Sequence, residues 1–498
     1  MCISTPMEQI SLSSTVGTTA AKLVAAEVSS LNTETANKWA STHGVGDRNA
    51  VWALNGNLGK LLHRLGSLAI LITFPFVSVF LWPVVENFNG SAVDFLKHIF
   101  STNGFECLQQ AYPRPSWLGF RYLAIFGILQ AFLQVSLPGK KVFGPPTPKG
   151  NVPVYKSNGI LSYVVTLALF IITWHLNLFN PAAVYDATGT IISTSNIFSF
   201  LLCLFLYFKG RWAPSSSDSG HTGSFLFDFY WGMELYPRLG PHFDIKTWSN
   251  CRMGMGSWAF LTLCDAAKQA ELSSTGYPSL SMLVTVGLMQ IYIIKFYLWE
   301  DGYWSSMDIA HDRAGYYLCW GCLVWVPSVY TSQAMYLVRQ PGTFLGGDLA
   351  SSSDLKILFA CLIFAVGVLA IYINYDSDRQ RRHFRSTKGR CLIWGKPPHK
   401  ITAKYITANG QVNESLLLAS GWWGVARHFH YLPEILAAFM WSCTAGTASI
   451  VPYLYLIFLT ALLVDRSYRD DERCRAKYGK SWELYCDLVP YRIVPFLF

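Results

Sequence analysis

Apolar stretches recur along this 498-residue chain and constrain its fold more than any other feature. They are about twenty residues long, the length at which a helix spans the hydrocarbon core of a bilayer. Only 14% of the residues are charged, whereas soluble chains carry about a quarter. The pattern predicts an all-α polytopic membrane protein. The expected spans lie near 65–85, 117–137, 159–180, 191–208, 253–270, 279–299, 314–338 and 355–375, with two short helices or a hairpin at 431–464.

The remaining charges indicate orientation and exclude one class of partner. The formal net charge of +9 is small and scattered, and no RNA- or DNA-binding motif occurs, so no nucleic-acid partner is expected. Lys and Arg before the first span favour a cytosolic N-terminus. We expect a flexible cytosolic segment at 1–45, N-terminal transmembrane helices over 46–212 and a second transmembrane region over 213–498.

The cysteines indicate reduced, buried thiols. Twelve occur, mostly inside apolar stretches and without a paired framework. Cys319 and Cys322 form a CxxC within YYLCWGCLVWV. A packed pair inside the membrane explains this spacing better than a metal or redox site.

The C-terminal segment 464–498 is dense in both charge signs and in aromatic residues. On a helix, Arg466, Asp470, Arg473 and Lys477 recur at spacings of four, three and four, so they share one face. This face suits a membrane-surface helix whose cations meet anionic headgroups. It equally suits a pocket for a phosphate-bearing ligand. Spacing alone leaves both interpretations open.

A second basic run, at 376–412, allows the same two interpretations. Arg381 and Arg385 are four residues apart and present two guanidinium groups on one helical face, which suits a phosphate as well as membrane anchoring. Trp422 and Trp423 follow, and they suit either stacking on a planar ring or interfacial anchoring. The later KYITANGQV predicts a small hairpin with Asn409-Gly410 at its turn.

The segment EDGYWSSMDIAHDR at 300–313 is a third candidate site. Glu300, Asp308 and Asp312 lie between two apolar stretches. Burial near the hydrocarbon is expected to raise their pKa values and to make protonated carboxyl groups available as acids. An ordinary interfacial loop is the alternative.

Four motifs together resemble the sterol reductase family, membrane enzymes that reduce ring double bonds of sterols. They are GMELYPRLG, MDIAHD, the block FRSTKGRCLIWGKPP with SGWWGVARHFHY, and RDDERCRAKYGKSWELYC with VPYRI. The resemblance implies about ten transmembrane helices in the endoplasmic reticulum. It also implies a catalytic C-terminal region with connected pockets for NADPH and for a sterol from the bilayer, and association with other sterol-biosynthesis enzymes. The CLIWG element resembles the branch that reduces the carbon 7–8 double bond.

The family's functional positions carry over to this chain as expectations. The cofactor-binding set would be Arg381, Arg385, Leu418, Trp423, Arg427, His430, Arg466, Asp470, Lys477, Tyr478 and Tyr485. Arg381 stands where many members have Lys, and His430 where many have Asn. Glu300 and Tyr303 match positions implicated in proton supply, with Trp304 as a rival to Tyr303, and Asp308 would add negative potential. No metal is expected.

That chemistry needs a proton before or during hydride delivery, because the double bond is not activated by a carbonyl. In a 5,7-diene, a proton at carbon 8 leaves a cation over carbons 7, 6 and 5, which hydride quenches at carbon 7. Three alternatives stay open at this point. They are reduction at carbon 14, the methyl transfer of isoprenylcysteine carboxyl methyltransferases, whose C-terminal architecture is similar, and sterol binding without catalysis.

Overall fold

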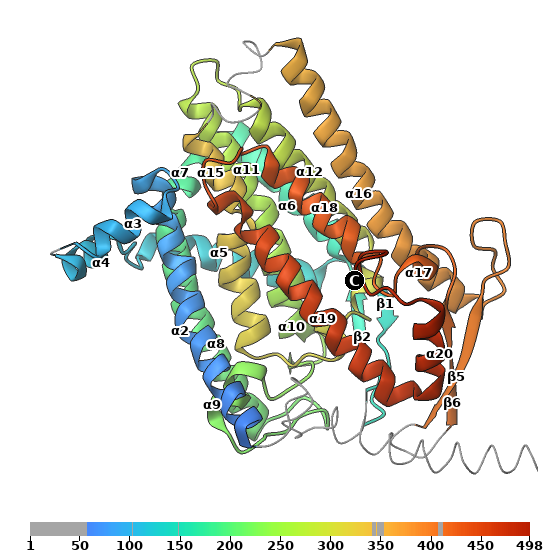
Figure 1. Cartoon of the computed structure of the whole chain (residues 1–498). Coiled ribbons are helices and arrows are strands. Elements are labelled where there is room, and N and C mark those ends of the chain that lie inside the picture. Colours follow the sequence, from blue (N-terminus) through green and yellow to red (C-terminus); the bar gives the residue numbers. More distant parts are fainter. Residues whose placement is uncertain (1–56, 102, 148, 341–344, 346–352, 407–411) are drawn as a thin grey trace, which may run out of the picture.

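The computed structural model describes residues 57–498 except 102, 148, 341–344, 346–352 and 407–411, with side chains from residue 65 onward except at residue 406. Helices make up most of it, as the apolar stretches predict (Figure 1). The predicted N-terminal segment 1–45 lies outside the described residues.

The long apolar stretches form the helices of one bundle. The helices of the first half are α2 (Asn57–Phe88), α3 (Ala92–Ile99), α4 (Gly104–Ala111), α5 (Trp117–Ser136), α6 (Gly159–His175), α7 (Pro181–Asp186), α8 (Thr188–Trp212) and α9 (Phe225–Trp231). Those of the second half are α10 (Ile245–Thr247), η1 (Trp248–Gly254), α11 (Met255–Leu272), α12 (Leu280–Leu298), α13 (Glu300–Tyr303), α14 (Met307–Ala310), η2 (Tyr316–Tyr330), α15 (Ser332–Arg339), α16 (Asp354–Ser386), α17 (Trp422–Val425), α18 (Tyr431–Cys443), η4 (Val451–Tyr453), α19 (Leu454–Tyr478) and α20 (Lys480–Leu488).

Five described helices are long and apolar enough to cross a membrane, which supports the expected multi-pass membrane protein. Their apolar parts are Leu65–Phe88, Trp117–Ser136, Thr188–Trp212, Leu280–Leu298 and Asp354–Ser386. The expected break within 431–464 is confirmed, because α18 ends at Cys443 and α19 begins at Leu454.

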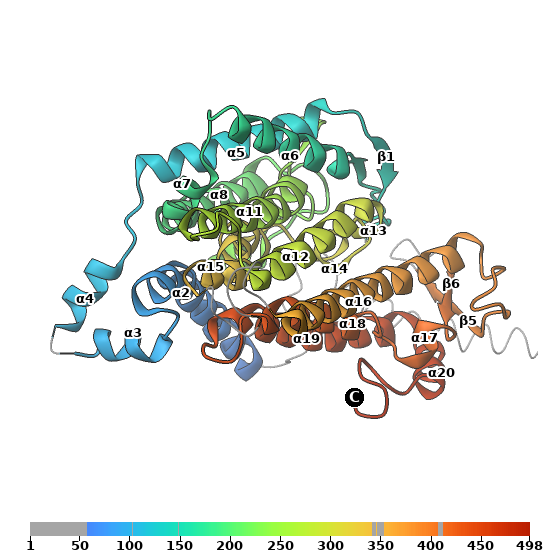
Figure 2. The same cartoon turned by 90° about the horizontal axis from the view of Figure 1, so that it is seen from above.

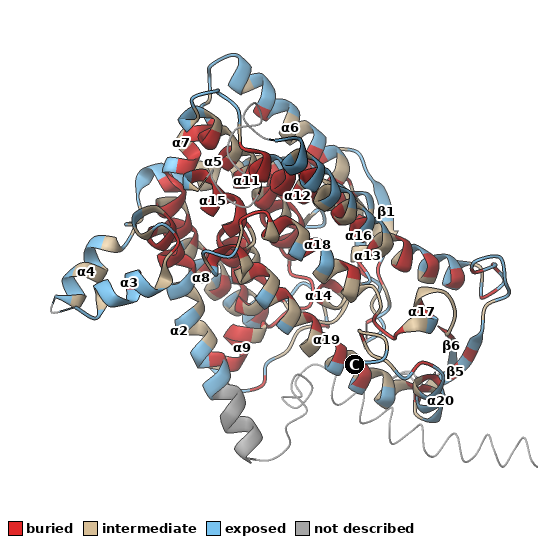
Figure 3. Ribbon diagram, turned by 45° about the horizontal axis from the view of Figure 1, so that its top comes forward, coloured by how far each residue is buried: buried red, intermediate tan, exposed pale blue. Residues whose placement is uncertain are grey.

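Seen from above, α12, α16, α18 and α19 lie side by side, and α5 and α6 lie on the other side of α12 (Figure 2). Buried residues concentrate between these helices, whereas outward faces, together with α3 and α4, are exposed (Figure 3). The exposed apolar faces suit contact with lipid.

Two segments, η1 and η2, are π-helical and pack against each other. Segment η2 contains Pro327, which has no N–H to donate to a regular α-helical ladder. Wider π turns of this kind are frequent at functional sites, and η2 forms one wall of the cavity described below.

Among the described residues, three short antiparallel hairpins connect or follow the helices. They pair β1 (Lys140–Phe143) with β2 (Val154–Ser157), β3 (Arg238–Leu239) with β4 (Phe243–Asp244), and β5 (Lys400–Ile406) with β6 (Val412–Leu418). The last pair confirms the predicted hairpin and places Ile401 opposite Leu417, while its Asn409-Gly410 turn lies outside the described residues. The hairpin of β3 and β4 lies where Pro237 and Pro241 disfavour a continuous helix.

Candidate functional site

A cavity of about 860 Å³ lies among α12, α13, α14, η2, α16, α18 and α19. All residues that line it fall between Asn250 and Tyr485, within the predicted region 213–498. One end is lined by aromatic and aliphatic side chains and the other by arginines and histidines. The cavity therefore joins two environments that suit different parts of a reaction.

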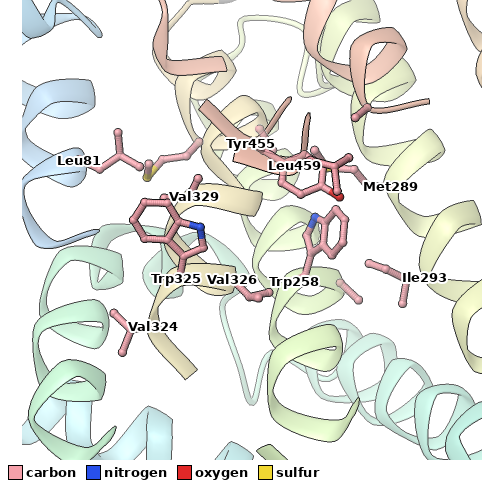
Figure 4. Packing of buried hydrophobic residues seen from close by; sticks show 14 of the residues in the cluster. Leu81, Trp258, Met289, Ile293, Val324, Trp325, Val326, Val329, Tyr455 and Leu459 are labelled. Atoms are coloured by element: carbon pink, nitrogen blue, oxygen red, sulfur yellow. The ribbon is translucent and has the colours of Figure 1, made fainter. Parts of the chain in front are cut away.

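Large apolar side chains form the first end of the cavity. Trp258, Trp325, Val326, Tyr455 and Leu459 line it, backed by further buried residues of the core (Figure 4). The Tyr455 ring lies 5.5 Å from that of Trp258, centroid to centroid. Walls of this kind suit a bulky apolar ligand, with a few polar groups to orient it.

Cations from two helices meet at the second end. Arg381 and Arg385 come from α16, one turn apart, and Arg466 and Arg473 come from α19. Four residues were predicted to share one face of α19, and three of them, Arg466, Asp470 and Arg473, line the cavity. The fourth, Lys477, does not line the cavity, and its ammonium nitrogen lies 4.1 Å from the Tyr405 ring centroid.

Aromatic side chains hold this end in place. The Arg381 guanidinium lies 4.1 Å from the Trp423 ring centroid, and the Trp423 indole donates to the Ser377 carbonyl at 2.8 Å. The Tyr485 hydroxyl donates to the Trp423 carbonyl at 3.3 Å. The His430 ring lies 4.9 Å from the Trp423 ring. Trp423 therefore connects α16, α17 and α20 at the charged end of the cavity.

Among the arginines and histidines that line the cavity, five buried polar atoms have no hydrogen-bond partner in the described protein. They are Nε of Arg427, Nε2 of His428, Nδ1 of His430, Nε of Arg466 and Nη1 of Arg473. A buried polar group without a hydrogen bond costs free energy, about 1 to 3 kcal/mol. Such atoms at one end of a cavity indicate a polar ligand that completes their hydrogen bonds.

The charges at this end are set by burial and by neighbouring cations. Burial lowers the pKa of His428 to about 4 and that of His430 well below its ordinary value, so both imidazoles are neutral near pH 7. Burial alone would raise the pKa of Asp470, but the nearby cations Arg473 and Arg381 hold it below its ordinary value. Burial and Arg473 lower the pKa of Lys477 to about 8.

Most of the predicted site residues come together in this one cavity. Those that line it are Tyr303, Asp308, Arg381, Arg385, Leu418, Trp423, Arg427, His430, Arg466, Asp470, Tyr478 and Tyr485. Arg427 also donates to the carbonyls of Val489 and Pro490, at 2.7 and 2.9 Å, and so ties the C-terminal segment to α17.

Glu300 lies elsewhere. Its carboxylate is buried, accepts from the Gly159 N–H at 2.8 Å and pairs with Arg252 at 2.6 Å, and it does not line the cavity. This placement differs from the expectation that Glu300 supplies a proton at the substrate. Three residues later, Tyr303 does line the cavity, whereas its rival Trp304 is buried against Tyr155, with ring centroids 4.8 Å apart.

The acidic groups of the MDIAHD motif also face cations. Asp308 pairs with Arg466, and Asp312 pairs with Arg469 at 2.7 Å. The buried Lys246 ammonium donates to the carbonyls of Ile309 and Asp312, which fixes the segment between the two carboxylates. These carboxylates are arranged to balance positive charge.

The predicted cofactor-binding set left out several polar residues that line the cavity, among them His428, Lys295, Asn374 and Glu434. Arg473, which its spacing had placed on the shared face of α19, also lines the cavity. Within the described residues, no three His, Cys, Asp or Glu side chains gather as a metal site. Cys319 and Cys322 are free thiols; Cys319 is buried, whereas Cys322 is partly buried and lines the cavity.

Comparison with known proteins identifies the family to which this chain belongs. The profile of the "Ergosterol biosynthesis ERG4/ERG24 family" matches residues 60–498. A "7-dehydrocholesterol reductase" of Arabidopsis thaliana is 52% identical over 431 residues, covering 86% of this chain and 96% of the plant protein. One of Xenopus laevis is 35% identical, covering 78% of this chain and 82% of the frog protein.

A protein of the same family with a different name is also similar. A "Delta(14)-sterol reductase" of Methylotuvimicrobium alcaliphilum is 35% identical over 429 residues, covering 86% of this chain and 93% of the bacterial protein. The resemblance drawn from the four motifs is thereby confirmed. The chain belongs to the ergosterol biosynthesis ERG4/ERG24 family and is a sterol reductase.

Proposed function

We propose that this protein reduces the carbon 7–8 double bond of 5,7-diene sterols with NADPH, as a multi-pass protein of the endoplasmic reticulum with about ten transmembrane helices. The observation that carries the proposal is a cavity in which a cluster of arginines and histidines meets an aromatic wall. Relatives named 7-dehydrocholesterol reductase support the choice of double bond.

The charged end fits NADPH on several independent grounds. A dinucleotide phosphate needs fixed cations, and Arg385 forms no salt bridge with any described residue, so its charge is available to a ligand. Arg381 and Arg473 lie beside it, each with one carboxylate neighbour. Trp423 and the neutral His430 would hold an aromatic ring and an amide, because a neutral imidazole offers one donor and one acceptor. When bound, NADPH would supply the hydride.

The apolar end would receive the sterol from the bilayer. A sterol is almost wholly apolar, so it needs the area that Trp258, Trp325 and Tyr455 provide. The polar wall group Tyr292, whose hydroxyl donates to Glu434 at 3.0 Å, lies between the two ends and would orient the ligand. Membrane lipid and the sterol are thus the proposed contacts of this end. Association with other sterol-biosynthesis enzymes also stays a proposal.

Tyr303 is the proposed proton donor at carbon 8. Burial, together with the nearby Asp308, raises the pKa of Tyr303 well above its ordinary value, so the phenol holds its proton at neutral pH. Asp308, whose carboxylate lines the same cavity, would stabilise the cation left on the sterol until hydride reaches carbon 7. Glu300 would act as a positioning residue, because its pair with Arg252 holds the start of the helix that ends at Tyr303.

The test is the loss of the ultraviolet absorbance of a 5,7-diene sterol when the purified protein in nanodiscs receives NADPH. We expect absorbance to fall with stoichiometric NADPH oxidation and a mass gain of two hydrogens. Unchanged absorbance in a preparation that is folded and binds NADPH would refute the proposal. An 8,14-diene sterol in parallel tests the second candidate, reduction at carbon 14, which the bacterial relative's name favours.

A further inference from the structure

The segment between α16 and β5, residues 387–399, alternates between buried and exposed apolar side chains. Cys391 and Ile393 are 8% and 6% exposed, whereas Leu392 and Trp394 are 62% and 59% exposed. We call this segment the return loop. Because the other side of this loop is buried, its exposed tryptophan and leucine form an apolar surface that we expect to contact another molecule or a membrane.

The buried side of the return loop fixes how it sits on the protein. Cys391 and Ile393 pack against Phe384, Leu418 and Trp423, at the back of the cavity wall. The Ile393 N–H donates to the Lys396 carbonyl at 2.8 Å, and the Lys396 N–H donates back at 3.1 Å. This tight bridge closes a turn whose two intervening residues are Trp394, which is largely exposed, and Gly395.

The backbone at Trp394 is strained. Its φ is +49°, in the left-handed region that bulky residues rarely adopt. Gly395, the next residue, accommodates its own φ of +77° without such a cost. Strain of this kind at an exposed aromatic residue indicates that the outward position has a use.

Contacts at the end of α16 indicate the depth at which the return loop lies relative to the bilayer. The apolar part of α16 ends at Tyr375, and Asp376 is its next charged residue after Lys356. The Trp422 indole donates to Asp376 at 2.9 Å, and the Trp394 ring lies 5.1 Å from the Trp422 ring. The loop therefore brings Trp394 back to the level at which α16 leaves the hydrocarbon, where tryptophan is favoured.

The charges of the loop match an anionic membrane surface. Lys388, Arg390, Lys396 and Lys400 are exposed, and no acidic residue occurs between 387 and 400. Basic residues beside a membrane are attracted to anionic headgroups. The outward side of α16 is apolar and exposed at Leu362, Leu369 and Tyr372, so the lipid-facing surface continues to the loop.

We propose that the return loop is a bilayer anchor: Leu392 and Trp394 insert into the interfacial layer while Lys388, Arg390 and Lys396 contact anionic headgroups. The proposal does not rest on the reaction. Because Ile393 packs against Trp423, the anchor also ties the wall of the cavity to the membrane surface.

An environment-sensitive fluorescent amino acid at position 392 or 394 tests the proposal in the full-length protein. The protein is placed in nanodiscs of phosphatidylcholine, with or without phosphatidylserine. The control carries the probe at Val412, an equally exposed apolar residue on β6. We expect blue-shifted emission at 392 and 394, quenching by lipids brominated on their acyl chains and several-fold protection from aqueous iodide relative to position 412.

Two results would overturn the anchor. Iodide quenching at 394 equal to that at 412 would place the loop in water, and quenching by neither agent would show that protein covers it. A K388Q/R390Q/K396Q variant tests the headgroup contact separately. We expect it to lose any dependence of the emission on phosphatidylserine but to keep the quenching by brominated lipid. A dependence equal to that of the unchanged protein would refute the contact.

Discussion

Two arginine–carboxylate pairs, Arg252 with Glu300 and Arg466 with Asp308, have the same chemistry and different surroundings. The first pair is closed: both side chains are at most 2% exposed, Glu300 also accepts from the Gly159 N–H, and Arg252 also donates to Asn158 at 2.8 Å. It joins α6, η1 and the start of α13. Its groups are directed at one another and away from any ligand.

The second pair is open. Arg466 and Asp308 both line the cavity, and Nε of Arg466 has no partner in the described protein. Nε of Arg252 also lacks a hydrogen-bond partner in the described protein, but that pair lies away from the cavity and fixes structure, whereas an unused donor beside a cavity can respond to a ligand. The comparison teaches that exposure to the cavity, and not the presence of a buried carboxylate, separates the structural pair from the functional one.

Replacing Tyr303 with Phe is expected to have the largest effect, because it removes the proposed proton donor, which lines the cavity together with the open pair. We expect turnover to fall about 10²- to 10⁴-fold, with NADPH affinity and thermal stability unchanged. Single-turnover loss of diene absorbance measures the chemical step. Tyr330→Phe, at the apolar end of the cavity, is the matched control and should lose far less. A Tyr303→Phe enzyme with the original rate would remove the phenol from the mechanism.

Replacing Glu300 with Ala tests the closed pair. Arg252 would be left buried without its counter-ion, which costs about 3 to 5 kcal/mol of stability. Denaturation in detergent measures this loss, and the fraction that remains folded should still bind NADPH. Glu414→Ala breaks the exposed pair with Lys404 and should cost no more than about 1 kcal/mol. Normal stability with abolished turnover would return Glu300 to the role of proton donor.

The same comparison shows what sequence patterns can and cannot reveal. The period of α19 was sufficient to predict that Arg466 and Asp470 share a face, because helical spacing is a local property. The direction of Glu300 was not predictable, because its partner Arg252 lies on η1, far along the chain, and only tertiary packing brings them together. The π-helical path of η2 has no comparable periodic signature, although the apolar stretch itself was evident.

Asp308→Asn tests the open pair and should have a smaller effect than loss of the donor. A neutral amide cannot stabilise a cation on the sterol, and it leaves the charge of Arg466 uncompensated at the cavity. We expect the turnover number at saturating substrate to fall about 10- to 100-fold. Asp301→Asn is the control, since Asp301 lines the same cavity but pairs with the exposed Lys140 and Arg382. Equal rates for both variants would contradict a specific role of Asp308.

The smallest expected effect concerns Lys477, which lies beside the charged end without lining the cavity. Its pKa of about 8 means that the ammonium form prevails below pH 8 and is lost as the pH rises. Bound phosphates favour the charged form, so NADPH affinity should fall, up to about tenfold, between about pH 7 and about pH 9. Titration calorimetry in nanodiscs across this range gives the profile. His428, with a pKa of about 4, stays neutral throughout.

Two substitutions at Lys477 separate its charge from its packing. Lys477→Arg keeps a permanent cation, so we expect affinity to be retained and the fall above pH 8 to disappear. Lys477→Met keeps the apolar stem beside Tyr405 but removes the charge, so affinity should be lower at pH 7 and equally independent of pH. A fall in affinity that persists in both variants would assign the titration to another group. It would also restrict the proposed phosphate-binding site to the arginines that line the cavity, where the open pair of Arg466 and Asp308 lies.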